Sequence, residues 1–248
     1  MIKIYVVLVL VLGSYTTLLG QGGPGGVSTE TIGNSNCKMW LDAGELILPD
    51  GSSVVSWNDI SLSANLNTPT QALAASQPTY RSDFSASING HAILRFLPAQ
   101  FLQLISSSDI NTNGPYTART TFMAFRTGSD VTTRQMLWEQ GGTVRGLNIF
   151  IFNGELYFGG YDLQVDADGT PSWGYTYTRV PVSPSTPYVV THVFDGPIGV
   201  TTGSISGFLN GQSFAMLNPG PGNPAAGVGS IASHPNAPGL GAINNDSY

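Results

Sequence analysis

The chain has 248 residues, of which 41% are hydrophobic and only 10% charged, with a formal net charge of −6. This length suits one large β domain and is enough to bury a core. Nucleic-acid binding needs a basic stripe on the surface, and the sequence has 9 basic against 15 acidic residues and no basic run. We therefore expect an acidic protein that does not have nucleic acid as a partner.

The first twenty residues have the pattern of a signal peptide. Lys3 supplies a positive charge, an apolar run follows at 4–12, and small and polar residues lead up to Gln21. The apolar run is too short to span a bilayer, and no other stretch approaches the roughly 20 apolar residues of a membrane helix. The pattern predicts a signal peptide over 1–20, secretion or display at the cell surface, and no membrane insertion.

Residues 21–36 are rich in glycine and are predicted to form a flexible lead-in. One domain is expected to follow over residues 37–248. Because Cys37 is the chain's one cysteine, no intrachain disulfide can form. A lone cysteine of this kind is most often a buried and unreactive thiol, so we expect core packing alone to hold the domain together.

From Trp40 onward the chain is a succession of short, strand-like runs rich in aromatic and β-branched residues. The clearest lie at 92–96, 101–105, 120–126, 147–152, 155–161, 188–194, 204–209 and 213–217. Asn153-Gly154 and Asn210-Gly211 each separate two of these runs, and Asn-Gly is the pair that a type I′ hairpin turn prefers. The sequence predicts an all-β fold, a two-sheet antiparallel sandwich with little helix.

Two further expectations concern the core and the tail of this sandwich. Residues 162–177 and 218–241 are predicted to be surface loops, because they are rich in Gly, Pro and polar residues. Eight apolar side chains should be largely buried: Trp40, Trp57, Phe96, Phe122, Ile149, Ile151, Val193 and Phe208.

Several segments resemble concanavalin A-like, laminin G-type jelly-roll domains, which are common in exported bacterial surface proteins. They are PGGVS at 24–28, MWLDAG at 39–44, VVSWNDIS at 54–61, QPTY at 77–80, NGHAILRF at 89–96, HVFDG at 192–196 and SISGFLNGQ at 204–212. The resemblance implies a concanavalin A-like jelly roll. It also implies that the last strand is lacking, since similar domains continue beyond the point where this chain stops. The loop at 61–67 departs from the Ser-Gly-Asn-Gly-Asn run typical of the family.

The sequence lacks the spacings that catalysis on such a fold needs. Glycosidases use two carboxylates roughly 5–10 Å apart. None of the four glutamates has a second acid two residues away: Glu30, Glu45, Glu139 and Glu155. No G-x-S-x-G motif is present, and the three histidines have no metal-ligand spacing. We therefore expect a protein that is not an enzyme.

One enzymatic alternative comes from a second, weaker resemblance. YFGGYDLQ at 157–164 is similar to a strand of jelly-roll alginate lyases, although the lysine of that strand is missing and the spacing is one residue short. The likeness implies a lyase site made of Tyr157, Tyr161, Gln164, Arg145 and His192. The simpler interpretation of His192 is a hydrogen-bonded histidine on a packed strand face.

Binding is the function that the residues favour, because aromatic side chains gather in the middle of the chain. Exposed Trp and Tyr beside polar side chains make platforms for the apolar faces of sugars. The candidate ligand-binding residues are Tyr161, Trp173, Tyr175 and Trp138. The expected partners are the glycans of polysaccharides or glycoproteins. The alternative is a structural domain that displays, and contacts, other domains of the same larger protein.

Calcium is the one cofactor that the sequence suggests, at two places. DADG at 166–169 sets Asp166 and Asp168 in a turn that could wrap Ca²⁺ with oxygen ligands, but it lacks the other EF-hand positions, so a solvated turn is the simpler interpretation. The family resemblance implies a second place at Asp42, Asp59 and Asn65.

Overall fold

A computed structural model describes residues 36–110, 118–141, 145–163, 174–195, 205–214 and 239–240. The predicted signal peptide and nearly all of the predicted lead-in lie outside these ranges. The described part is all-β apart from two short 3-10 helices, η2 (Ala43–Glu45) and η3 (Ala74–Ser76). No helix within the described ranges is long and apolar enough to cross a membrane.

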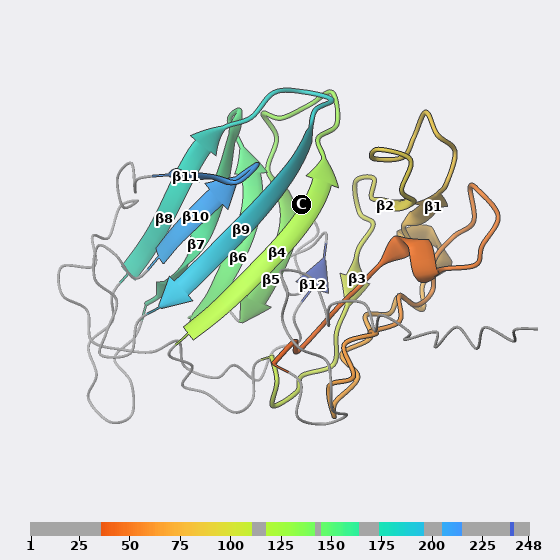
Figure 1. Ribbon diagram of the computed structural model, residues 1–248, viewed down its shortest axis with the longest axis horizontal. Coiled ribbons are helices and arrows are strands. Elements are labelled where there is room, and N and C mark those ends of the chain that lie inside the picture. Colours follow the sequence, from red (N-terminus) through yellow and green to blue (C-terminus); the bar gives the residue numbers. More distant parts are fainter. Residues whose placement is uncertain are drawn as a thin grey trace, which may run out of the picture.

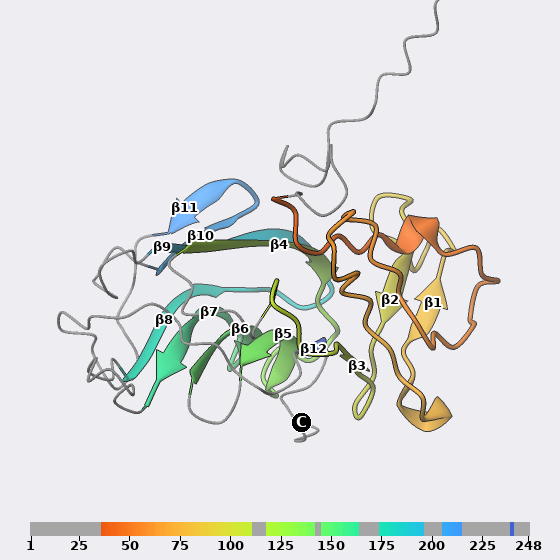
Figure 2. The ribbon, with the colours of Figure 1, turned by 90° about the horizontal axis from the view of Figure 1, so that it is seen from below.

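The strands form two facing sheets and one small side sheet, and every pair is antiparallel (Figures 1 and 2). The four-stranded sheet has the order β11 (Gln212–Phe214), β10 (Ile205–Leu209), β9 (Pro187–Asp195) and β4 (Ala118–Arg126). The six-stranded sheet has the order β3 (Leu102–Gln103), β12 (Gly239–Leu240), β5 (Gln135–Gly141), β6 (Arg145–Phe152), β7 (Glu155–Asp162) and β8 (Gly174–Pro181). The side sheet pairs β1 (Thr79–Arg81) with β2 (Ile93–Arg95). The predicted antiparallel sandwich is confirmed.

Both predicted hairpins are confirmed at the residue level. Asn153 and Gly154 have φ values of 51° and 77° between β6 and β7, and Asn210 and Gly211 have 51° and 78° between β10 and β11. A type I′ turn needs positive φ at both central residues, which Asn and Gly adopt at low cost. These two local signals therefore set the register of two strand pairs.

The sandwich has strands in three places where the sequence did not predict them. Strand β8 occupies the end of the predicted loop at 162–177, and β12 lies near the end of the predicted loop at 218–241. Strand β5 has a register shift between Met136 and Trp138, so its apolar residues do not alternate cleanly. A bulge of this kind puts two residues opposite one and hides the period of two on which strand prediction depends.

The core lies between the inner faces of the two sheets. The cluster includes Ile149 and Phe158 from the six-stranded sheet and Val190 and Leu209 from the four-stranded sheet. The sheets approach closely at Gly207, where an added Cβ would lie 1.8 Å from the Phe158 ring. A glycine at this position is what lets the buried ring fit between the layers.

Two of the predicted core residues are on the outside. Phe122 and Phe208 are 41% and 37% exposed, so the prediction that they are buried was wrong. In β4 the alternate residues Met123 and Phe125 pack against the core instead. Because successive side chains point to opposite faces of a sheet, Phe122 must then face outward. Ile149 and Ile151 are buried as predicted, whereas four others are only partly buried: Trp40, Trp57, Phe96 and Val193.

Residues 36–110 form a largely irregular flank beside the sandwich, which contains the side sheet and supplies β3 to the six-stranded sheet (Figure 2). Isolated bridges pair Ser53 with Thr79 and Thr70 with Gln103, which link this flank to the side sheet and to β3. The thiol of Cys37 is buried, as predicted. Burial, followed by the charge of Asp59, raises the pKa of this thiol and makes the reactive thiolate scarce.

Candidate functional site

Aromatic side chains gather on the outer face of the six-stranded sheet. Ile149 and Ile151 point into the core, so the intervening Phe150 faces outward. Its ring stacks on Tyr157 of β7, with centroids 4.8 Å apart and planes 2° from parallel. Tyr177 of β8 meets Phe150 edge-on at 5.5 Å. We call these three partly buried rings the aromatic cluster.

Charged groups frame the aromatic cluster. The guanidinium of Arg134 lies 5.6 Å from the centre of the Phe150 ring. Arg179 forms an ion pair with Glu155 at 3.1 Å, and the Tyr157 hydroxyl donates to the same carboxylate at 3.0 Å. The hydrogen bond with Tyr157, followed by the charge of Glu155, raises the pKa of Arg179. The cluster therefore combines flat apolar rings with fixed charges at its rim.

A buried polar pair lies on the same outer face. Glu139 of β5 is the direct cross-strand partner of Asn148 on β6. Glu139 is 0% exposed, and among the described residues neither its carboxylate oxygens nor Asn148 Oδ1 has a hydrogen-bond partner. Burial raises the pKa of Glu139 to about 8. The side chain is therefore mostly protonated at neutral pH and can both donate and accept a hydrogen bond.

The polar pair and the aromatic cluster belong to one cross-strand row. Asn148 is paired with Gly159 of β7, and Gly159 is paired with Tyr177 of β8. With strands roughly 4.8 Å apart, the row from Glu139 to Tyr177 spans about 14 Å. Gly159 contributes no side chain between the two ends. The row thus joins a partly exposed aromatic end to a buried polar end.

Of the aromatic residues predicted to bind ligand, only some lie on this outer face. Tyr161 lies on this outer face but is 8% exposed, and it is paired across the strands with Tyr175. Trp138 is 3% exposed and belongs to the core cluster between the sheets, so its ring lies away from the outer face that carries the aromatic cluster. Trp173 and the side chain of Tyr175 lie outside what the structure describes.

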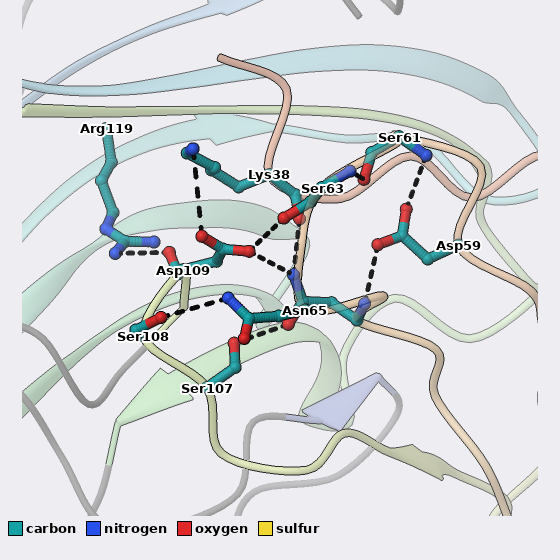
Figure 3. A network of polar contacts seen from close by, with 10 residues as sticks. Lys38, Asp59, Ser61, Ser63, Asn65, Ser107, Ser108, Asp109 and Arg119 are labelled. Atoms are coloured by element: carbon teal, nitrogen blue, oxygen red, sulfur yellow. Dashed lines mark hydrogen bonds and ion pairs between the residues drawn. The ribbon is translucent and has the colours of Figure 1, made fainter. Parts of the chain in front are cut away.

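The predicted calcium residues near the flank have other roles. The carboxylate of Asp59 accepts a backbone N–H from Ser61 at 2.9 Å (Figure 3). It accepts two more, from Trp40 at 2.9 Å and from Asn67 at 2.8 Å. Asp42 caps η2 by accepting from Gly44 N, at 2.8 Å. Asp59 therefore acts as a structural acceptor that fixes the polar loop at 61–67.

A second carboxylate closes the same network. Asp109 accepts from the Ser63 hydroxyl and from Asn67 Nδ2 at 3.3 Å, and it lies 3.9 Å from Lys38 Nζ (Figure 3). Burial raises the pKa of Asp109, but the hydrogen bonds and the lysine outweigh it and hold this pKa below its usual value. Arg119 of β4 donates to the backbone carbonyl of Asp109 at 2.9 Å, which ties the flank to the sandwich.

The residues suggested as the second calcium place are engaged in hydrogen bonds of their own in the described part of the chain. The third suggested ligand, Asn65, donates its amide to the Ser108 hydroxyl at 3.1 Å. Among the described residues there is no group of three or more His, Cys, Asp or Glu that could hold a metal. Asp166 and Asp168 lie outside the described residues, so calcium at that turn stays a prediction.

The residues of the alternative lyase site lie in different layers. His192 is 2% exposed on the inner face of β9, with its ring 6.0 Å from Phe158 in the core. Tyr157 and Tyr161 lie on the outer face of the other sheet, because they alternate with the inward-facing Phe158. His192 therefore does not share a site with these tyrosines. The prediction of a packed strand face holds for His192, but its Nε2 has no hydrogen-bond partner in the part of the chain that the structure describes.

The sequence did not identify Glu139 and Asn148 as site residues. In the sequence Glu139 is a glutamate without a neighbouring acid, and its cross-strand partner lies nine residues away on the next strand. One signal was available in the sequence: a glutamate directly after Leu137 and Trp138, in a run otherwise suited to a buried strand. A charge in such a run is costly unless it has a function or a partner.

The fold and site define the class of the protein as an antiparallel β-sandwich. No model of a protein family matches the chain, and no curated protein matches it. Among solved structures, it is similar to the crystal structure of the botulinum neurotoxin serotype G binding domain, with a TM-score of 0.41 and 11% identity. The match covers 79% of this chain and 44% of that one, so this chain spans less than half of the other's length. A likeness this distant carries no argument about function.

Proposed function

We propose that this protein is a secreted or surface-exposed glycan-binding module of the concanavalin A-like, jelly-roll type, without catalytic activity. The observation that carries the proposal is the row from Tyr177 to Glu139. Sugars present apolar C–H faces to aromatic rings and hydroxyls to polar groups. The row offers a ring at its partly exposed end, and unpartnered oxygens of Glu139 and Asn148 at its buried end.

The protonated state of Glu139 favours binding of neutral sugar hydroxyls. A neutral carboxyl group donates one hydrogen bond and accepts others, and Asn148 Oδ1 accepts one more. A ligand hydroxyl that meets these atoms would satisfy groups that are buried without partners in the described structure. Arg134 and Arg179 at the rim of the aromatic cluster add donors for ring or glycosidic oxygens.

The spacing of carboxylates supports binding rather than glycoside hydrolysis. Glu155 is the other described glutamate on this outer face, two strands from Glu139 and four residues along β7 from the row. Strand spacing and rise per residue put their Cα atoms about 16 Å apart. The catalytic pair of a glycosidase is roughly 5–10 Å apart. These two groups are too far from each other to act on one sugar bond.

A structural display domain is the alternative function, and glycan binding separates the two. The secreted protein would be screened on a glycan array, and the best glycan then titrated calorimetrically as a free oligosaccharide. We expect Tyr177→Ala to weaken binding about tenfold, the effect of losing about 1–1.5 kcal/mol of stacking. Phe84→Ala is the matched control, since Phe84 is an exposed ring on the flank.

Two results would overturn the proposal. One is a folded Tyr177→Ala variant that binds the glycan as tightly as the parent. The other is a folded parent protein that binds no glycan on the array, which would leave the display function in place. Far-UV circular dichroism of each variant confirms that the fold is intact.

A further inference from the structure

The outer face of the four-stranded sheet is unusually apolar. Phe122 is 41% exposed and Phe208 is 37% exposed, and the register puts them on either side of Thr191. Val189, on the same face of β9, is 51% exposed. An antiparallel sheet with one solvent-facing side normally carries polar residues there. We call this surface, formed by the outward residues of β4, β9 and β10, the apolar face.

The other side chains in the middle of the apolar face are small or uncharged. The remaining outward residues in its middle are Thr120, Ala124, Val193 and Ser206. Among the described residues of this face, charges occur only at its two ends, where Arg126 is paired with Pro187 at one end and Asp195 with Ala118 at the other. Strands β4, β9, β10 and β11 contain no lysine. The face therefore lacks the charged side chains that usually keep an exposed sheet surface from associating.

The charge pattern of the apolar face is self-complementary. A two-fold axis that lies between two facing copies, perpendicular to their strands, relates one copy to the other. Strands β4 and β9 of the second copy then run in the opposite direction to those of the first. Arg126 of one copy then lies at the end where the second copy has Asp195, and the reverse holds at the other end. Phe122, Thr191 and Phe208 stay in the middle, where they meet their own counterparts. Closed two-fold pairing of this kind uses one patch on both subunits.

The size of the apolar face suits a weak, reversible contact. Strands β4 and β9 have nine residues each and are about 30 Å long, β10 has five residues and is about 17 Å long, and the three strands are about 14 Å across. Two such faces together bury less than about 1,000 Å², which is in the range of weak, transient protein interfaces. A partner surface with charges of one sign would place a like charge against either Arg126 or Asp195. A membrane surface would in addition need a cluster of basic residues.

We propose that the protein forms a reversible two-fold dimer by packing the apolar faces of two copies against each other, with Arg126 of each copy paired to Asp195 of the other. This face lies on the opposite layer from the aromatic cluster (Figures 1 and 2). The dimer is therefore independent of the proposed glycan site and leaves both copies of that site uncovered.

Sedimentation equilibrium of the secreted protein, from about 1 μM to about 1 mM, tests the dimer. We expect the parent to shift from monomer to dimer over this range, and Phe122→Ser with Phe208→Ser to stay monomeric. Phe84→Ser, on the flank, is the matched control and should dimerise like the parent. A parent that stays monomeric throughout, or a folded double variant that dimerises as well as the parent, overturns the proposal.

Charge exchange tests the arrangement of the two copies. Arg126→Asp alone puts like charges together and should weaken the dimer at least tenfold. Adding Asp195→Arg restores opposite charges, so the doubly exchanged protein should dimerise to within about threefold of the parent. If the double exchange dimerises no better than Arg126→Asp alone, the antiparallel two-fold arrangement is wrong.

Discussion

Replacing Glu139 by glutamine should change how the stability of the protein depends on pH. Burial raises the pKa of Glu139 from 4.5 to about 8 in the folded chain. Between these two values the folded state holds a proton that the unfolded state has lost. The stability that comes from this proton is fully present below about pH 4.5 and is lost as the pH rises through 8. A glutamine side chain cannot ionise, so the Glu139→Gln variant does not undergo this loss.

The size of the effect follows from the shift. Each pKa unit corresponds to 1.36 kcal/mol, so the shift of Glu139 from 4.5 to about 8 means that its ionisation destabilises the fold by at most about 5 kcal/mol. A whole domain has a stability of only about 5–15 kcal/mol. We therefore compare the free energy of unfolding of Glu139→Gln with that of the parent at each pH. The difference in favour of the variant should be several kcal/mol larger at pH 8.5 than at pH 4.5.

The assay is urea unfolding of the parent and of Glu139→Gln at pH 4.5, 6.5 and 8.5. His192 has the opposite effect, because burial lowers its pKa from 6.5 to about 4. Its contribution to stability is present above pH 6.5 and is lost as the pH falls towards 4. Both proteins contain His192, so the difference between them isolates Glu139. Parallel pH profiles of the two proteins would refute the reasoning.

Two substitutions test the packing and the polar network. Gly207→Ala forces a Cβ into the ring of Phe158 and should lower the free energy of unfolding by more than about 3 kcal/mol. Gly128→Ala is the control: no atom lies closer than 3.9 Å to the added Cβ, so the free energy of unfolding should change by less than about 1 kcal/mol. Thermal unfolding measures both, and equal melting temperatures would contradict the close approach. Asp59→Ala leaves three backbone N–H groups without their acceptor and should cost several kcal/mol in urea unfolding. Asp42→Ala removes one exposed cap and should cost only about 1 kcal/mol, so a smaller loss for Asp59→Ala would assign the network a minor role.

The sequence could predict the features that depend on residues adjacent in the chain. Asn153-Gly154 and Asn210-Gly211 specify their turns by backbone preference alone, and both hairpins form. The exposure of Phe122 and Phe208 could not be read in this way. Both residues sit in apolar runs, and which alternate set faces the core depends on the opposite sheet.

The candidate site depends even more on long-range pairing. Glu139 becomes notable only once Asn148 and Gly159 are known to share its row, and the bulge in β5 hides which way it points. Asp59 was predicted as a calcium ligand from the family resemblance. Two of its three backbone donors, Trp40 and Asn67, lie 19 and 8 positions away, and no local pattern reveals them.

Strands β5 to β8 are neighbours in the chain as well as in the sheet, each pairing with the next. Strand β4 instead pairs with β9, which begins about 60 residues later. Closing a long loop costs more conformational entropy than closing a short one, so contacts between distant residues form more slowly. The β5–β8 meander is therefore the natural place for folding to begin. Until β9 docks on β4, the newly made protein exposes the inner face of that meander, so folding must avoid intermolecular association during this interval.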